Sequence, residues 1–136
     1  MPETYKDRQI RLKKEKRQSL FHKYGGKCSY CGCDLTENNF QIDHYIPKRR
    51  GSNDFYHSNY KKEKGSDNIE NLYPCCGSCN ASKSDLDLED FRERIYDRIN
   101  RLNKYSTEYN IAKRYGLIQE IKKPIVFHFE IYLNNG

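Results

Sequence analysis

The sequence predicts a small α+β domain that is held together partly by bound metal. Three observations support this fold class. Helical patterns lie toward both ends of the chain, a short alternating strand lies in the irregular middle, and two Cys-x-x-Cys pairs flank that strand. The 136 residues suit one domain, but only 35% are hydrophobic and 32% are charged, so the core is small. Metal ligation would add the stability that such a core lacks.

The N-terminal part, residues 1–27, predicts a basic helix or arm. It carries nine basic and three acidic side chains, and neither Gly nor Pro interrupts residues 3–24. Residues 28–90 have a charge balance of −4, and residues 91–136 have a balance of +4. Two basic flanks around an acidic middle favour a polyanion such as nucleic acid as the partner. Solvated helix surfaces are the plain alternative explanation of the same flanks.

The middle of the chain has little regular periodicity. Residues 40–46 begin by alternating apolar and polar side chains, which predicts a short strand that ends at Pro47. Residues 48–68 follow as a long polar loop.

The C-terminal part, residues 92–136, is predicted to be an extension of helices and one strand. A helix begins near Asp87, its N-cap, because apolar side chains recur at helical spacing from there on: Leu88, Phe91, Ile95, Ile99 and Leu102. A second helix is expected from Ser106 to Tyr115, with Gly116 as its stop. After Pro124 apolar residues alternate, which predicts a half-buried C-terminal strand.

Two classes of protein are not expected from this sequence. The longest apolar run is residues 125–127, which is far too short to span a bilayer, so no membrane association is predicted. The first residues contain no apolar core of a secretory signal, so a cytoplasmic location is expected. In a reducing compartment, six cysteines indicate metal ligands before disulfides.

Four of the cysteines have the spacing of a structural zinc site. Cys28 and Cys31 form one Cys-x-x-Cys pair, Cys76 and Cys79 form another, and 44 residues separate the pairs. Two such turns supply the four thiolates that tetrahedral Zn²⁺ accepts, with no open position for catalysis. The adjacent Cys75 makes the second pair ambiguous in principle. Cys75 and Cys33 are interpreted as ordinary small residues.

A second group of polar residues lies between and beside these pairs. Asp43 and His44 stand toward the end of the predicted strand, and Asn80 follows the last zinc cysteine directly. Mg²⁺ prefers carboxylate and amide oxygens, which Asp43 and Asn80 offer. A neutral imidazole at His44 could accept a proton from water. Together these groups suit hydrolysis of a phosphodiester at a Mg²⁺ or Mn²⁺ ion.

These residues resemble the HNH endonucleases, also called ββα-metal or His-Me finger nucleases. The resemblance covers about residues 20–91 and rests on Cys28-x-x-Cys31, Asp43-His44-x-Ile46-Pro47, the run 65–72 and Cys76-x-x-Cys79-Asn80-x-x-Lys83. It implies a β-hairpin followed by a helix, beginning near Ser78, that together clasp one divalent ion. It also implies that His44 is the general base, that Asp43 and Asn80 bind the ion, and that Asn71 fixes the loop and helps to orient His44.

Two parts of the chain depart from the family pattern. Residues 53–64 look like an insertion, and the segment after residue 91 matches no motif of the family. The basic run of Lys48, Arg49 and Arg50 is expected to bind nucleic-acid phosphates, as is Lys83, one helical turn past Asn80.

The sequence therefore predicts a single-domain DNA endonuclease, with residues 28–91 as its core. The main alternative is a zinc-ribbon-like module that binds nucleic acid without cutting it, and a protein-interaction module is a third interpretation. The sequence yields no prediction of oligomeric state.

Overall fold

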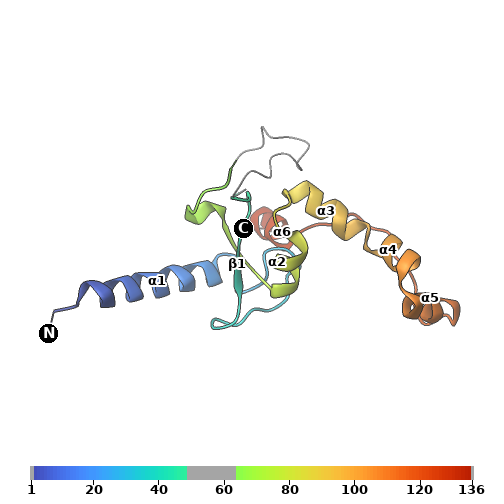
Figure 1. Ribbon diagram of the computed structural model, residues 1–136, viewed down its shortest axis with the longest axis horizontal. Helices are drawn as coiled ribbons and strands as arrows, with labels where there is room; N and C mark the ends of the chain where they lie inside the picture. The colour runs from blue at the N-terminus through green and yellow to red at the C-terminus, as the bar shows by residue number, and fades with distance from the viewer. Residues whose placement is uncertain (1, 49–63, 136) are drawn as a thin grey trace.

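A two-stranded sheet and the helix that follows it form the centre of the molecule. The computed structural model describes residues 2–48 and 64–135. Strand β1 (Gln41–His44) pairs antiparallel with β2 (Leu72–Cys75), with Gln41 opposite Cys75 and His44 opposite Leu72. Helix α2 (Gly77–Lys83) begins two residues after β2 and lies beside the sheet (Figure 1). The expected strand and the expected helix near Ser78 are both confirmed.

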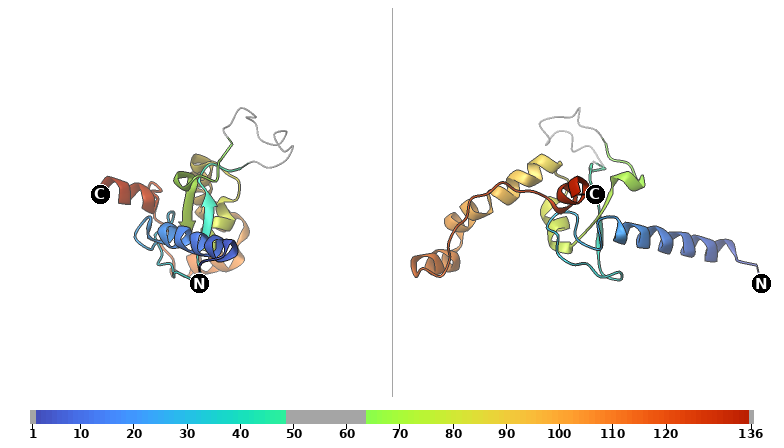
Figure 2. Two further views of the ribbon diagram at one scale, coloured as in Figure 1. Left: turned by 90° about the vertical axis from the view of Figure 1, so that its left-hand side faces the viewer. Right: turned by 180° about the vertical axis from the view of Figure 1, so that it is seen from behind.

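Helix α1 (Tyr5–His22) projects away from this centre, as Figures 1 and 2 show. Its start is fixed by a capping box, in which the Thr4 side chain accepts a hydrogen bond from the backbone of Asp7 and the Asp7 carboxylate bonds back to Thr4. Leu20 is its buried residue, so only the last turns pack on the core. The rest of the helix is solvated on all sides, in agreement with the expected basic helix.

On the other side, three helices lead away from the centre (Figure 1). The long helix expected after Asp87 is two helices, α3 (Leu88–Tyr96) and α4 (Arg98–Tyr105), which meet at Asp97. Helix α5 (Thr107–Arg114) lies within the expected range 106–115, and its N-cap is Ser106, whose side chain accepts a hydrogen bond from the Tyr109 backbone N–H. Of these helices α3 alone contributes a fully buried side chain, Phe91.

The core is mainly aromatic. Tyr30 lies at its middle, with ring centroids 5.3 Å from Phe91, 5.6 Å from Phe127 and 6.3 Å from Phe129. Tyr24, just after α1, and Tyr73, in β2, complete it, with their ring centroids 5.4 Å apart. Edge-to-face pairs of this kind add to the free energy of burial. A two-stranded sheet is marginal by itself, so this cluster is what stabilises it.

The expected C-terminal strand is wrong, because the chain there forms helix α6 (His128–Asn135). Phe127 and Phe129 both enter the core, as the alternation suggested. The extended segment ends there, however. The Phe127 N–H donates to the Glu130 carboxylate at 2.9 Å, and the Phe127 carbonyl accepts from Ile131 at 3.3 Å, which starts a helix. Beyond Phe129 the apolar side chains are exposed, so burial does not favour extension.

No helix within residues 2–48 and 64–135 is long and apolar enough to cross a membrane.

Candidate active site and metal cluster

Cysteines from two parts of the chain lie close together, some in the turn at residues 28–33 and the others at the N-terminal end of α2. The Sγ atoms of Cys28, Cys31, Cys33 and Cys76 all lie within 4.8 Å of one another, and those of Cys31 and Cys76 are 3.9 Å apart. Zn–S bonds of about 2.3 Å in a tetrahedron place sulfurs about 3.8 Å apart. The cluster therefore fits a zinc ion.

Cys79 joins the same cluster from the first turn of α2. Its backbone N–H donates to the Cys76 sulfur at 3.4 Å. A hydrogen bond with its thiol lowers the pKa of Cys28 to about 4, which favours the thiolate that a metal requires. Three of the four cysteines expected at the zinc site lie in the group whose sulfurs are mutually within 4.8 Å, and Cys79 adjoins that group through Cys76 and Cys28.

The interpretation of Cys33 as an ordinary small residue is wrong, because its sulfur belongs to the cluster. Gly32, at φ +77°, turns the chain, and the Cys28 N–H donates to the Cys33 carbonyl at 2.8 Å. This tight turn returns Cys33 to Cys28, which the spacing Cys-x-x-Cys-x-Cys could have signalled. Cys75 points into the core instead, where burial raises the pKa of its thiol and keeps the proton on.

Asp43 is buried on the side of β1 that faces α2. Its Oδ2 accepts a hydrogen bond from the Tyr30 hydroxyl at 2.5 Å and lies 3.0 Å from the Lys83 Nζ. Lys83 also donates to the His44 carbonyl at 3.1 Å. Its side chain is 0% exposed and that of Asp43 is 6% exposed. A buried ammonium needs such partners.

The expectation that Lys83 contacts nucleic-acid phosphate is therefore corrected. Lys83 is buried and paired with Asp43, because one helical turn past Asn80 places it over the strand and not over solvent. Tyr30 was not singled out in the sequence, since a tyrosine between two cysteines has no motif of its own.

His44, at the end of β1, contacts a carboxylate that the sequence analysis did not single out. Its Nε2 lies 2.9 Å from Asp67 Oδ1, and the other oxygen of Asp67 accepts from Lys48 Nζ at 2.8 Å. The Lys48 and His44 side chains lower the pKa of Asp67 to about 2. Asp67 lies in the family-like run 65–72, the only signal that could have indicated it.

The predicted phosphate-binding run is only partly described. Lys48 pairs with Asp67, whereas Arg49 and Arg50 lie outside the described residues, as does the expected insertion apart from Lys64.

Asn71 joins the two ends of the loop that follows His44. Its side chain accepts from the Ile46 N–H at 2.7 Å and donates to the carbonyls of Ile46 at 3.0 Å and Ser66 at 2.8 Å. Gly65 comes so close that a Cβ there would lie 1.6 Å from the Ile46 carbonyl oxygen. Asn71 therefore ties the two ends of the loop together, and its expected role in orienting His44 stays a prediction.

Asn80 faces β1 from α2. Its amide nitrogen donates to the Gln41 side-chain oxygen at 2.6 Å. Asn80 and Lys83 are three residues apart on one helix face, and Gln41 and Asp43 are two apart on one strand face. The helix therefore lies along the strand, with Asn80 at Gln41 and Lys83 at Asp43. The amide oxygen of Asn80 is the atom turned away from Gln41.

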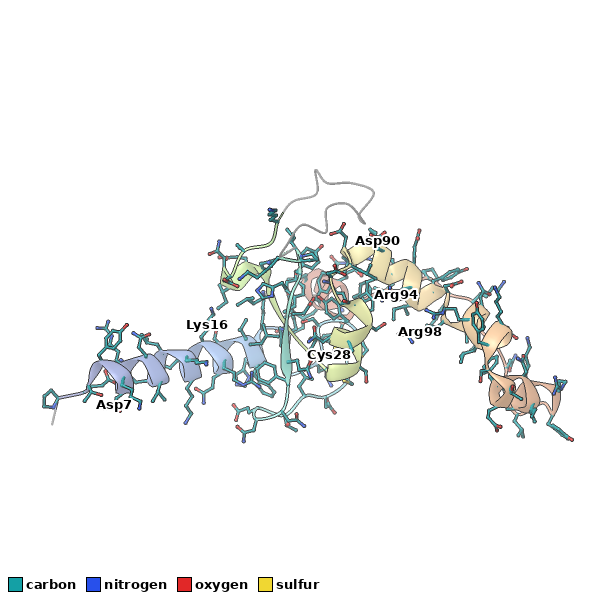
Figure 3. All side chains as sticks on the ribbon, in the orientation of Figure 1. Asp7, Lys16, Cys28, Asp90, Arg94 and Arg98 are labelled. Atoms are coloured by element: carbon teal, nitrogen blue, oxygen red, sulfur yellow. The ribbon has the colours of Figure 1, made fainter. Side chains whose placement is uncertain are left out.

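One face of α1 carries most of its free positive charge. Lys13 and Lys6 lie seven and fourteen residues before the buried Leu20, and so on the same face. Neither has an ion pair among the described residues, whereas Arg11, on the other side, pairs with Glu3. Lys16 shares the basic face and extends from the helix in Figure 3.

A second basic group lies beside α2. Arg94 donates to the Ser82 carbonyl at 2.7 Å, and Arg98 bonds to the Ser82 hydroxyl. Figure 3 labels both arginines along the stretch where α3 passes into α4. These contacts tie the C-terminal helices to the end of the helix that carries Asn80.

Parts of this chain are similar to known proteins. Residues 28–86 match the sequence profile of the family described as HNH endonuclease. The chain is 35% identical over 69 residues to the "SPbeta prophage-derived putative HNH endonuclease YoqL" of Bacillus subtilis (strain 168). This region is 50% of the chain and 27% of that relative, so the chain spans about a quarter of the relative's length. The Type II-C Cas9 enzyme from Actinomyces naeslundii superposes with a TM-score of 0.47 and 19% identity, over 88% of this chain and 14% of the other.

Proposed function

We propose that this chain, whose residues 28–86 match the HNH endonuclease family, is a metal-dependent nuclease that hydrolyses DNA phosphodiester bonds. The observation that carries the proposal is the ββα unit, with His44 at the end of β1, Asp43 beside it and Asn80 facing the same strand from α2. The runner-up, a zinc-ribbon-like module that only binds nucleic acid, requires none of these three side chains.

His44 acts as the general base in this proposal. Because the carboxylate of Asp67 has a pKa of about 2, it is ionised at neutral pH and can only accept a hydrogen bond. The Nε2 atom of His44 therefore carries the proton in that contact, and Nδ1 has the lone pair that takes a proton from water. Asp67 would also stabilise the imidazolium that forms.

Asp43 and Asn80 would hold one divalent ion, Mg²⁺ or Mn²⁺. Their carboxylate and amide oxygens are the hard donors that either ion accepts, with water and phosphate completing the shell. Tyr30 and Lys83 both contact Oδ2 of Asp43, so Oδ1 is the oxygen that would bind the ion. When bound, the ion would stabilise charge on the phosphate and on the leaving oxygen. Zinc at Cys28, Cys31, Cys76 and Cys79 would serve the fold.

Nicking of supercoiled plasmid in Mg²⁺ tests this function. His44→Ala should lower the rate by about 10²- to 10⁴-fold, the usual effect of losing a general base. His22→Ala is the matched control, because its side chain is 67% exposed and contacts Glu37, away from the site. Zinc content is measured for every variant. Equal rates for both variants would exclude His44 as the base, and DNA binding without cleavage by the wild type would favour the runner-up.

The basic face of α1 provides a separate test of DNA as the partner. The double variant Lys6→Gln and Lys13→Gln should weaken DNA binding and reduce the slope of log K against log [salt] by up to about 1.8, at about 0.9 per lost phosphate contact. Arg8→Gln with Gln18→Glu removes the same net charge from the opposite face and serves as the control. Equal losses in the two double variants would mean that only net charge matters.

A further inference from the structure

Tyr30 connects the cysteine cluster to the nuclease site. It stands between Cys28 and Cys31, yet its side chain is turned inward and is 2% exposed. Its hydroxyl donates to Asp43 Oδ2 at 2.5 Å. One side chain therefore spans from the turn that would hold zinc to the carboxylate that would hold the divalent ion.

The turn that carries Tyr30 is fixed on the hairpin. The adjacent Ser29 donates twice to the Pro74 carbonyl, from its backbone N–H at 2.9 Å and from its hydroxyl at 2.6 Å. Pro74 is paired with Ile42, next to Asp43 in β1. The ring of Tyr30 is also packed against Phe91 and Phe127. The hydroxyl consequently has little freedom to leave Asp43 while the turn is intact.

We propose that Tyr30 is a positioning residue, through which the cysteine cluster sets the orientation of the Asp43 carboxylate and hence the affinity of the nuclease site for its divalent ion. The inference rests on the proposed function. Lys83 holds the same oxygen from α2, so two elements fix Oδ2 and leave Oδ1 directed at the ion. Without the hydroxyl, the carboxylate can rotate about its bond to Cβ and satisfy Lys83 with either oxygen.

Binding of Mn²⁺ to the zinc-loaded full chain, measured by electron paramagnetic resonance, tests this inference. Tyr30→Phe keeps the ring and removes only the hydroxyl, and we expect Mn²⁺ to bind about tenfold more weakly, the effect of about 1.4 kcal/mol lost from a hydrogen bond to a charged group. Tyr73→Phe is the matched control. It removes a hydroxyl from the same core, but one that bonds to Tyr24 and not to Asp43.

The outcomes separate this inference from the proposed function. Weaker Mn²⁺ binding in Tyr30→Phe alone, with one zinc per chain in both variants, supports it. Equal affinities in wild type and Tyr30→Phe would overturn it, as would loss of zinc or of the fold in Tyr30→Phe, because the hydroxyl would then serve structure only. A wild type that binds no Mn²⁺ would instead refute the proposed function.

A second measurement tests whether the two sites communicate. With one equivalent of Co²⁺ at the cysteine cluster, its visible absorption bands report the geometry of the thiolates. Because coupling between two sites is reciprocal, Mg²⁺ should shift these bands in the wild type and leave them unchanged in Tyr30→Phe. The same shift in both proteins, or no shift in the wild type, would overturn the coupling.

Discussion

Replacing Lys83 by methionine should be among the most destabilising single changes in this protein. The substitution keeps most of the side-chain volume but removes an ammonium that is 0% exposed and lies 3.0 Å from Asp43 Oδ2. The Asp43 carboxylate then stays buried, with the Tyr30 hydroxyl as its side-chain hydrogen-bond donor within the described part of the chain. Breaking a buried ion pair from one side costs about 3–5 kcal/mol, against a total of about 5–15 kcal/mol for a typical domain.

Urea denaturation of the zinc-loaded protein at neutral pH measures this cost. Lys16→Met, on the solvated part of α1, is the control and should change the free energy of unfolding by less than about 0.5 kcal/mol. The double variant Lys83→Met and Asp43→Asn removes both charges and should recover much of the loss. Because the two residues are in contact, the double-mutant cycle should be clearly non-additive. Additive effects, or a loss in Lys83→Met no larger than in Lys16→Met, would refute the reasoning.

Three further predictions concern the loop and the cysteine cluster. Gly65→Ala should destabilise the protein by about 1–3 kcal/mol and impair nicking, because its Cβ would lie 1.6 Å from a backbone oxygen; an unchanged melting temperature would contradict this. Pairing of Asp67 stabilises the fold above the ordinary pKa of 3.8 and is lost as the pH falls through about 2, so Lys48→Met should raise the pKa of Asp67, measured by NMR titration. Cys33→Ser and Cys79→Ser should each retain one zinc per chain and the double variant should not, since five thiols surround four positions; zinc loss in either single variant would show that thiol to be indispensable.

Local sequence signals predicted most of the elements correctly. Helix α1, strand β1 and helix α5 follow from a run without Gly or Pro, from alternation and from a stop glycine, signals that act within a short stretch of the chain. The C-terminal segment was assigned wrongly because alternation up to Phe129 suits a strand, while the turn that begins α6 depends on contacts with residues 29 and 30, a hundred positions away. Periodicity contains no information about such contacts.

The candidate site was likewise predictable only where local motifs indicate its residues. Spacing and residue type indicated Asp43, Asn80 and the two cysteine pairs as candidates, because their chemistry is visible in the motifs. The roles of Tyr30 and Lys83 could not be predicted, since a tyrosine and a lysine are ordinarily solvated or part of a core. Only the packing of α2 on β1 buries Lys83 against a carboxylate.

The closed base of the loop between Pro47 and Gly65 has a consequence for how this protein can vary. The Gly65 N–H donates to the Pro47 carbonyl at 2.8 Å, and the Asn71 side chain ties Ile46 to Ser66, so these bonds hold the two ends of the loop together. Doubling the length of a flexible loop whose ends already meet costs only about 0.6 kcal/mol. This junction is therefore a site that tolerates insertion, where a recognition peptide or a whole domain could be added while the spacing of His44 and Asn80 stays unchanged.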